Sequence, residues 1–506
     1  MRDLRGSKRT LFLLLTVAAL VWSRPGEVVS LDFETISWDV GGEIVEMGAA
    51  DLDGDGLKEI IVAGNVYHDK ETRRFLGCYR ITRGQPQSVS EVFRWEVGPE
   101  PVVWDTGVLP GSHRERGVYY LAADGLWLLE QTAGRALRPV HVIDEHPLLA
   151  TGQEDSFLAL DFIRDWDGDG KEEVLVPCTA SARFYRSAGE GAFELSEEIP
   201  VRQFSAYNNN VLFGRRLNGY HLLSIFIYPL IVPTDLDGDG RQDMLVIQGG
   251  KGYRYIRNKE GRLEPDASVW DLDIRTADEV IRHRATLSYH VADLNHDGCA
   301  DVVVHKVSAR FHDWNAETAV FLGSRHGRGL EGPSLRFFSK GFLSGVSLDD
   351  LDGDRMPDLS IWSVKMGLWP LIDILLRKVI NLQSEYHYYA GKNIFNKRPD
   401  YIKSYEFRIE TSRPDYFLGV VPTTDGDFNG DGIKDLVAQV KEDTIGIYLG
   451  RKRQDFEQAP CAVFAAPRVN YVKVDDIDMD GSTDLFAYQA EKDGSRCLLW
   501  LNRSHR

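Results

Sequence analysis

An acidic segment of nine residues recurs seven times along the chain, and no other sequence feature constrains the fold as strongly. Its copies share the pattern D-x-[DN]-x-D, with Gly at position 6 in six copies and with Asp or Glu at position 9. They begin at Asp51, Asp165, Asp235, Asp293, Asp350, Asp427 and Asp476. Self-similarity of this kind indicates a repeat architecture, in which each copy belongs to one structural unit.

The spacing of the acidic side chains predicts a cation site in every copy. Positions 1, 3, 5 and 9 always carry side-chain oxygen atoms, and the main-chain carbonyl group of position 7 can add another. Calcium takes about six to eight oxygen ligands and tolerates irregular geometry, whereas magnesium demands an octahedron and zinc prefers nitrogen or sulfur. We therefore predict up to seven calcium ions. The predicted ligands are Asp51, Asp53, Asp55, Leu57, Glu59, Asp165, Asp167, Asp169, Lys171, Glu173, Asp235, Asp237, Asp239, Arg241, Asp243, Asp293, Asn295, Asp297, Cys299, Asp301, Asp350, Asp352, Asp354, Met356, Asp358, Asp427, Asn429, Asp431, Ile433, Asp435, Asp476, Asp478, Asp480, Ser482 and Asp484.

Glycine at position 6 permits the sharp chain reversal that brings position 9 back toward the ion. In the fifth copy Arg355 replaces this glycine, so we expect the loop from Asp350 to Asp358 to be the weakest of the seven sites. An ordinary acidic turn would explain a single copy, because Asp and Gly dominate turns. Seven copies with the same four oxygen positions favour metal binding.

The charge balance agrees with a cation ligand. The chain has 59 Lys and Arg against 77 Asp and Glu, and its net charge of −18 argues against nucleic acid or an anionic membrane surface as the main partner. Five loops contain four acids at the ligand positions and two contain three, so 26 of the 77 carboxylates lie in these loops. Like charges this close together are costly without counterions. Seven calcium ions would add +14 and bring −18 to −4.

The loops differ from the EF-hand, which needs a bidentate Glu at position 12 and a helix on each side. Position 12 is apolar in every copy: Val62, Val176, Val246, Val304, Ile361, Ala438 and Ala487. Apolar, often β-branched runs such as 60–62 and 302–304 follow the loops, as is typical of strands buried in a packed sheet. Position 2 is apolar as well and would anchor each loop on the core. The loops are therefore predicted to connect strands.

From about Gly41 to Arg506 the chain resembles the FG-GAP or VCBS-type repeats, because its loops and strand pattern match their D-x-D-x-D-G-x-x-D calcium loops. In that family the loops link strands of integrin-α-like β-propeller blades. The resemblance implies an all-β fold, a single propeller over residues 31–506, and metal ligands at positions 1, 3, 5 and 9 of each loop. The Phe-Gly and Gly-Ala-Pro signatures of the family are not clearly present, which weakens an analogy to integrin ligand binding.

The spacing of the loops predicts the number of blades. Their starts lie 114, 70, 58, 57, 77 and 49 residues apart, so the first interval is about twice too long. Within it, residues 102–107 contain a single acid, and the strand-like run Val118–Ala122 follows. We interpret this segment as a blade that has lost its metal loop, which gives eight blades. Seven blades, with residues 100–145 as an elaboration, remain the alternative.

The two ends of the chain are predicted to meet in one blade. After the last loop only two strand-like runs remain, Asp484–Gln489 and Arg496–Asn502, which leaves the final blade one strand short. The segment Leu31–Val40 precedes the first blade and can supply that strand. Such a closure leaves no sheet edge unpaired.

One segment departs from the strand pattern. Apolar residues at 368, 372, 375, 379 and 382 have the spacing of a helix, which predicts a helical insertion near residues 366–385. Charged residues interrupt it, so it is not a membrane span. It is expected either to pack on the rim of the propeller or to form, with Tyr386–Tyr389, a contact for a partner or glycan.

The N-terminus has the pattern of an export signal. Four basic residues within 1–9 precede the apolar run Leu11–Trp22, which is too short to span a bilayer comfortably. We expect residues 1–23 to be a signal peptide, with an uncleaved N-terminal anchor as the alternative. The mature chain, without a membrane span, would then be periplasmic, secreted or held at the cell surface. Its five cysteines are too few to hold the fold together, although Cys461 and Cys497 could form a disulfide.

A search for catalytic motifs finds no H-E-x-x-H, G-x-S-x-G, Walker loop or Cys/His zinc spacing. We therefore expect a non-enzymatic calcium-binding propeller that binds a protein or a polysaccharide, with calcium mainly structural. The alternative is a polysaccharide lyase of the rhamnogalacturonan-lyase type, since some of these enzymes are similar eight-bladed propellers. Arg282–Arg284 or Tyr386–Tyr389 would then be its candidate active-site groups. The sequence leaves the oligomeric state open.

Overall fold

The structure is a computed structural model of the 506-residue chain. It describes residues 31–504 except 69–70, 83–87, 110–115, 132–136, 149–156, 190, 202–204, 208–210, 213–214, 217–223, 227, 266, 282–284, 311–312, 326–331, 342–343, 365–376, 378, 410–416, 419, 442, 454 and 490–493. The expected signal peptide, residues 1–23, and the candidate lyase residues Arg282–Arg284 lie outside the described residues. No helix among the described residues is long and apolar enough to cross a membrane.

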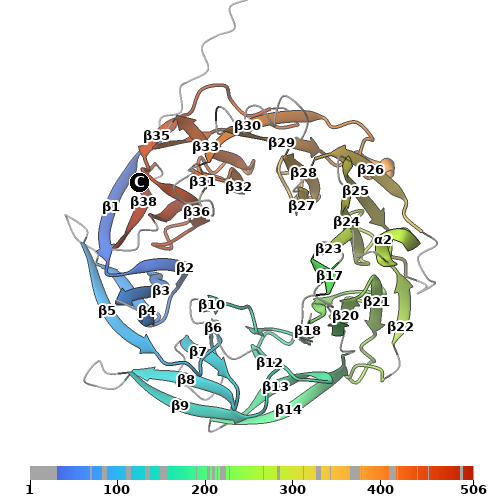
Figure 1. Ribbon diagram of the computed structural model, residues 1–506, viewed down its shortest axis with the longest axis horizontal. Coiled ribbons are helices and arrows are strands. Elements are labelled where there is room, and N and C mark those ends of the chain that lie inside the picture. Colours follow the sequence, from blue (N-terminus) through green and yellow to red (C-terminus); the bar gives the residue numbers. More distant parts are fainter. Residues whose placement is uncertain are drawn as a thin grey trace, which may run out of the picture.

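Eight antiparallel blades surround a central axis, and the first of the four main strands of each lies on the inner side of its blade; in blade 2 the short strand β10 (Leu158–Ala159) lies inside that strand (Figure 1). Blade 1 contains β2 (Glu43–Ala50), β3 (Glu59–His68), β4 (Glu71–Thr82) and β5 (Ser88–Val97), and blade 2 contains β6 (Val103–Gly107), β7 (Gly117–Ala122), β8 (Gly125–Gln131) and β9 (Leu137–Asp144). Blade 3 contains β11 (Ile163–Arg164), β12 (Glu173–Pro177), β13 (Ser181–Gly189) and β14 (Ala192–Pro200). Blade 4 contains β19 (Leu230–Thr234), β20 (Asp243–Gln248), β21 (Lys251–Tyr255) and β22 (Ser268–Asp271). Blade 5 contains β23 (Ala285–Ala292), β24 (Asp301–Arg310), β25 (Asp313–Phe321) and β26 (Leu335–Lys340), and blade 6 contains β27 (Ser344–Asp349), β28 (Asp358–Val364), β29 (Val379–His387) and β30 (Tyr401–Ile409). Blade 7 contains β32 (Thr423–Gly426), β33 (Asp435–Lys441), β34 (Thr444–Tyr448) and β35 (Ala462–Ala465). Blade 8 contains β36 (Val469–Asp475), β37 (Asp484–Gln489), β38 (Ser495–Asn502) and β1 (Phe33–Val40).

A few short elements supplement the blades. They are β10 (Leu158–Ala159), parallel to β6; β31 (Phe417–Leu418), paired with β30; the pairs β15 (Ser205–Tyr207) with β18 (Ser224–Phe226) and β16 (Val211–Leu212) with β17 (Arg215–Arg216); the helix α2 (Ala277–Ile281); and the 3-10 turn η2 (Gly391–Asn393). Within the described residues, helix is therefore almost absent, as expected for an all-β propeller.

The hydrophobic core lies between neighbouring blades. Val302 and Val304 of β24 pack with Leu245 of blade 4, whereas Val303 packs with Ile361 of blade 6. Successive side chains of a strand point to opposite faces, so a strand covered on both faces needs a continuous apolar run rather than an alternating one. This requirement explains the apolar runs that follow the acidic loops in the sequence.

The structure confirms the predicted ring closure. β1 pairs with β38 in antiparallel register from Phe33 opposite Asn502 to Val40 opposite Ser495. The final blade thus takes its outer strand from the N-terminal end of the described chain and its other three strands from the C-terminal end (Figure 1).

The structure also decides between eight blades and seven. The strands β6 to β9, within residues 103–144, pair antiparallel in sequence order and, with the short parallel strand β10, form a sheet of their own between blades 1 and 3. This segment is blade 2 rather than an elaboration of a neighbour. The eight-bladed prediction is confirmed, whereas residues 110–115, where the acidic loop is predicted to have been lost, lie outside the described residues.

The predicted helical insertion near residues 366–385 is wrong in its C-terminal part. Residues 379–385 lie in β29, which pairs with β28 and β30, while residues 365–376 and 378 lie outside the described residues. The 4, 3, 4, 3 spacing that suggested a helix continues into Val379 and Leu382, yet β-branched residues such as Val379 and Ile380 favour a strand where partners exist on both sides. Tyr386 and Tyr388 are buried in the core, so they are not available to a glycan.

Disulfide bonds do not contribute to the fold. All five cysteines have free thiol groups, and four of them are buried. Cys497 is fully buried against the sulfur atom of Met47, and Cys461 lies near the main chain of Ile447. The possible bridge between Cys461 and Cys497 is therefore absent.

Candidate metal centres

The seven acidic loops occupy equivalent places in seven blades. Each joins the first strand of its blade to the second, and this shared strand order places all seven at the same face of the ring. Position 2 anchors the loop as expected, because Trp166, Leu236, Leu294, Leu351, Phe428 and Ile477 are buried and Leu52 is partly buried. The buried side chain at position 2 thus anchors the start of each loop on the core.

The carboxylate at position 9 closes every loop. One of its oxygen atoms accepts a hydrogen bond of 2.8–2.9 Å from the main-chain N–H of position 2 in all seven copies. In five copies the other oxygen accepts an N–H bond at or after the third strand of the blade, from Arg257, Gly323, Tyr389, Gly450 and Asn502. The ninth residue thus ties the loop to two strands of its blade.

Burial makes these position 9 carboxylates hard to ionise without a cation nearby. Burial raises the pKa of Asp301, Asp358, Asp435 and Asp484 to about 7, although the N–H bonds that they accept act in the opposite direction. Neighbouring loop acids raise these pKa values further. A divalent cation would favour the charged form of each group by opposite-charge attraction.

Positions 1, 4 and 6 set the loop conformation. The position 6 N–H donates to the position 1 carboxylate in all seven loops. Position 6 has a left-handed φ in every copy, and Arg355 adopts 67° where the glycines adopt 80–87°. Arg355 therefore keeps the loop geometry, at the strain cost of a non-glycine residue in this region. Position 4 is left-handed as well, including the non-glycine residues His296 and Met479.

The predicted side chains converge in five of the loops. In each, one oxygen atom from every member of the group lies within 4.8 Å of the others, a set of hard oxygen donors that fits a calcium ion. The groups are Asp165, Asp167, Asp169 and Glu173; Asp51, Asp53 and Glu59; Asp235, Asp237 and Asp239; Asp350, Asp352 and Asp358; and Asp476, Asp478 and Asp484. Position 5 is missing from three of the groups and position 9 from one.

The two remaining loops have asparagine at position 3. The amide groups of Asn295 and Asn429 donate to the position 5 carboxylates Asp297 and Asp431 over 3.1 and 2.9 Å. At position 7 the main-chain N–H of Leu57, Lys171, Arg241, Cys299, Met356, Ile433 and Ser482 donates to the position 5 carboxylate. The carbonyl groups of these residues remain predicted ligands.

Basic side chains contact several loops, and the loop pattern gave no signal for them because they lie elsewhere in the sequence. Arg80 pairs with Asp53 and Glu59 of the first loop. Arg453 of blade 7 reaches Asp352 and Asp354 in the loop of blade 6, over 2.9 and 2.8 Å.

The closing blade has a similar contact at its loop. Arg503 pairs with Asp478 and Asp480 of that loop, and with Glu34 of β1. One guanidinium group from the C-terminal end of the chain thus joins the loop of blade 8 to the N-terminal strand.

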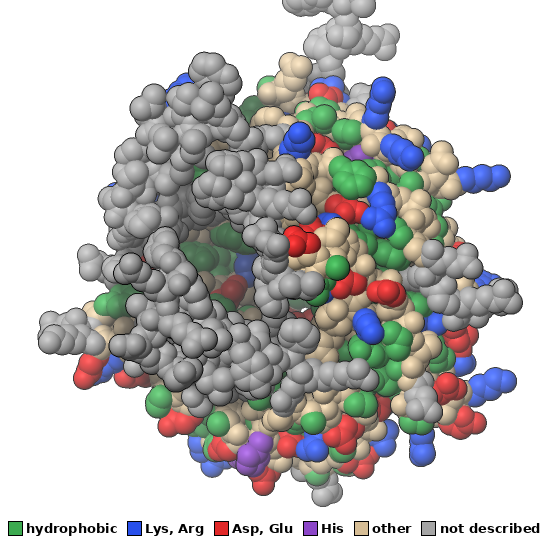
Figure 2. Space-filling model, turned by 45° about the vertical axis from the view of Figure 1, so that its right-hand side comes forward, with side chains coloured by type: hydrophobic (Ala, Val, Ile, Leu, Met, Phe, Trp, Pro, Cys, Tyr) green, Lys and Arg blue, Asp and Glu red, His purple; other side chains and the backbone are tan. Residues whose placement is uncertain are grey.

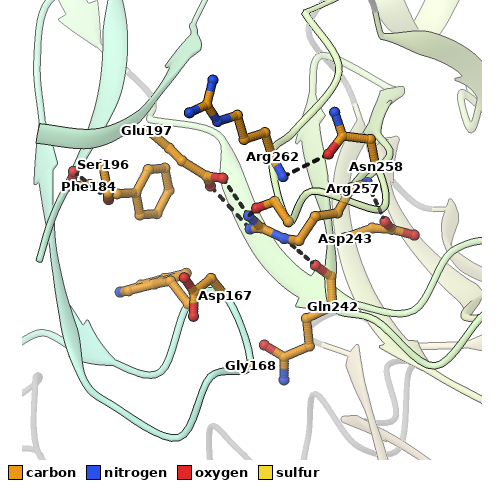
Figure 3. A network of polar contacts seen from close by, with 12 residues as sticks. Asp167, Gly168, Phe184, Ser196, Glu197, Gln242, Asp243, Arg257, Asn258 and Arg262 are labelled. Carbon is orange, nitrogen blue, oxygen red and sulfur yellow. Dashed lines mark hydrogen bonds and ion pairs between the residues drawn. The ribbon is translucent and has the colours of Figure 1, made fainter.

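Neighbouring loops also contact one another around the ring. The position 8 N–H groups of Lys58, Ala300 and Lys434 donate to main-chain carbonyl oxygens in the loop of the preceding blade, over 2.8–3.0 Å. A further seam joins blades 3 and 4, where the buried guanidinium of Arg257 pairs with Glu197 and donates to the carbonyl of Gln242 (Figure 3). The loops therefore connect blades as well as strands.

A hollow of 680 Å³ lies between blades 6 and 7, apart from the loops. Its lining includes Lys403, Tyr405, Lys441 and Tyr448. The Lys403 ammonium group lies 4.9 Å from the centre of the Tyr448 ring, and burial lowers the pKa of this lysine. A positively charged group beside aromatic rings is suited to a polar or anionic ligand group.

Comparison with solved structures returns other proteins of low similarity. An Agrocybe aegerita lectin, described as recognising non-reducing terminal N-acetylglucosamine, is 12% identical with a TM-score of 0.39, covering 92% of this chain and 96% of its own. Sqt1 from Chaetomium thermophilum is 7% identical (TM-score 0.42; 91% and 97% covered), and the Nup133 β-propeller domain of Vanderwaltozyma polyspora is 8% identical (0.36; 92% and 97%). These similarities are too low to carry an argument about function.

Comparison with family models gives a direct result, whereas no curated protein matches the chain. The model of the FG-GAP-like repeat matches residues 235–304, which contain the loops that begin at Asp235 and Asp293 and the strands between them. The resemblance stated from the loop pattern is confirmed by this match. Residues 235–304 are thus an FG-GAP-like repeat, set within an eight-bladed β-propeller.

Proposed function

We propose that the protein is an exported, non-enzymatic β-propeller that calcium stabilises and that binds a protein or a polysaccharide. The observation that carries the calcium part is the sevenfold repetition of one loop geometry, with oxygen donors at positions 1, 3, 5 and 9 and a buried carboxylate that joins two strands. The basic N-terminal segment before the apolar run supports export, and the net charge of −18 supports a partner other than nucleic acid.

Calcium would act mainly on stability. A site with a dissociation constant of about 10⁻⁴ M, in about 1 mM free calcium, stabilises the folded state by about 1.4 kcal/mol. Several such sites together would match the whole stability of an ordinary domain, which is about 5–15 kcal/mol. The proposed role is therefore substantial even if each ion binds weakly.

Thermal unfolding tests the calcium proposal. The melting temperature is expected to rise with added calcium, to rise much less with the same concentration of magnesium, and to fall in excess chelator. Magnesium serves as the control for ionic strength and charge. A melting curve that is the same in calcium and in chelator would contradict the proposal.

The hollow between blades 6 and 7 is the proposed contact for the partner. It combines Lys403 and Lys441 with the ring of Tyr448, whereas acidic and basic groups are interspersed over the described part of the surface in Figure 2. A glycan array and a protein-interaction screen, each run with wild type and with Lys441→Glu, would test this location. We expect ligand binding that the variant loses, with Lys340→Glu on blade 5 as the control of equal charge change.

An assay for catalysis separates binding from the lyase alternative. Incubation with pectic polysaccharides should yield no unsaturated products in the ultraviolet if the protein is a binding module. Formation of such products would overturn the non-enzymatic proposal.

A further inference from the structure

The seven loops are not equivalent in the positive charge that they already contain. Three of them hold an arginine side chain that bridges two acids of the predicted ligand set: Arg80 at the loop from Asp51, Arg453 at the loop from Asp350, and Arg503 at the loop from Asp476. The other four loops show no such bridge among the described residues. Two of these four contain a single local contact, in which Lys171 or Arg241 at position 7 pairs with position 5.

A bridging guanidinium satisfies the same oxygen atoms that a cation would need. In blade 6 the Nε of Arg453 lies 2.9 Å from one oxygen of Asp352, and a second nitrogen lies 2.8 Å from Asp354. Asp352 is only 1% exposed, so its charge needs a partner within the protein. Arginine presents a planar, permanently charged fork that suits paired carboxylates.

Position 5 belongs to the converging group in the loops from Asp165 and Asp235 but not in the three loops with a bridging arginine, whereas the loops from Asp293 and Asp427 form no converging group among the described residues. In the three loops with a bridging arginine, the converging oxygen groups include positions 1, 3 and 9 and omit position 5. In two of these loops the omitted residue, Asp354 or Asp480, is itself paired with the arginine. By contrast, all four acids converge in the loop from Asp165, which has no bridging arginine.

We propose that arginine replaces calcium in the loops that begin at Asp51, Asp350 and Asp476, so that the protein binds four calcium ions rather than seven. The inference rests on the proposed calcium function. The ion sites are then the loops from Asp165, Asp235, Asp293 and Asp427. Arg453 also crosses from blade 7 to blade 6, so the guanidinium group at that loop joins two blades.

Counting bound calcium tests the proposal. Equilibrium dialysis of the full protein against calcium, followed by elemental analysis, should give four ions per chain. Arg453→Met removes the guanidinium from the blade 6 loop and should raise the count to five. Arg496→Met is the matched control and should stay at four, because Arg496 is equally exposed, at 53% of its side-chain surface, and pairs with Asp39 in a similar geometry away from the loops.

Two further measurements keep the outcomes distinct. Asp431→Ala in the blade 7 loop should lower the count from four to three. In chelator, Arg453→Met should have a lower melting temperature than Arg496→Met, and calcium should reduce this difference. Seven ions in wild type, or no gain in Arg453→Met, would overturn the inference while the calcium function stands; no bound calcium in any variant would overturn both.

Discussion

Blade 2 and blade 7 have the same four-stranded topology but join their first two strands differently. Blade 7 uses the acidic loop from Asp427 to Asp435, whose ninth residue accepts N–H bonds from Phe428 and Gly450, each over 2.8 Å. Blade 2 has no such loop, although its strands pair in the same order. The acidic loop is therefore not required to form a blade.

Direct polar contacts with blade 3 are found at the same end of blade 2. The Asp105 carboxylate accepts N–H bonds from Phe162 and Ile163, each over 2.8 Å. Arg116 donates to Glu172 over 3.0 Å and to the carbonyl of Thr106 over 3.1 Å. Blade 2 thus uses permanent side-chain contacts at a place where the other blades use loops with an excess of negative charge.

The comparison teaches that an acidic loop can contribute to the stability of its blade in two separable ways. One is the network of N–H bonds to its carboxylates, which exists with or without a metal, and the other is the neutralisation of its charge. Blade 2 has neither of them, blade 7 has the N–H network and is proposed to rely on calcium for the neutralisation, and the blades with a bridging arginine lie between these two cases. The following predictions test this division from the largest expected effect to the smallest.

Removal of calcium is expected to have the largest effect, because it acts on all occupied loops at once. Amide hydrogen exchange in chelator should accelerate by about tenfold in β33 of blade 7, which corresponds to about 1.4 kcal/mol per site. Exchange in β7 of blade 2 should change less. Mass spectrometry of peptides from the two strands measures the difference, and equal acceleration in both would remove the distinction between the blades.

Asp435→Ala should follow in size. It leaves the buried N–H groups of Phe428 and Gly450 without their acceptor, which costs about 2–5 kcal/mol in the free energy of unfolding. The loss should persist in chelator, because the N–H bonds do not need the ion. Denaturant titration measures it, with Asp425→Ala at an exposed site of the same blade as the control. A loss seen only with calcium present would show that the carboxylate acts through the metal alone.

Arg116→Met should cost about 1 kcal/mol, since it breaks a partly exposed ion pair and one hydrogen bond in blade 2. The loss should be the same in calcium and in chelator, which distinguishes it from substitutions in the loops. Arg138→Met, at a more exposed ion pair of the same blade, should change stability less. Calcium dependence of the Arg116→Met effect would contradict the separation of the two kinds of blade.

The smallest effect concerns pH. Burial raises the pKa of Asp105 from 3.8 to about 6, while N–H bonds from Ile163, Thr106 and Phe162 oppose the shift. Between these two pH values the Asp105 carboxyl group is protonated to a greater extent in the folded protein than in the unfolded chain. Its contribution to stability therefore falls as the pH rises. Asp105→Asn lacks that fall, and its stability relative to wild type should improve from about pH 4 to about pH 7. If the stabilities of wild type and Asp105→Asn changed in parallel over this pH range, the raised pKa of Asp105 would be contradicted.

The sequence predicted the architecture well because the loops repeat at blade spacing. The apolar residues after each loop and the strand-like segment Leu31–Val40 were enough to predict eight blades and their closure, which the structure confirms. The segment around Val379 and Leu382 was misjudged, because apolar spacing alone does not tell a helix from a strand whose two faces are both covered.

The candidate sites were predictable only in part. Local spacing specifies positions 1, 3, 5 and 9, because these residues belong to one short loop. The guanidinium groups of Arg80, Arg453 and Arg503 reach their loops through tertiary contacts, from the same blade or the next, and no spacing rule locates them. The same is true of the N–H partners of position 9 at the third strand.

The pairing of β1 with β38 has a consequence for biogenesis. Phe33 and Asn502 are partners, so the last blade is incomplete until nearly the whole chain has been synthesised. Contacts between such distant segments form late, because closing a long chain loop is entropically costly. Until then, the outer strand waits unpaired while seven other blades assemble, and a chain truncated before Ser495 would expose a sheet edge to aggregation.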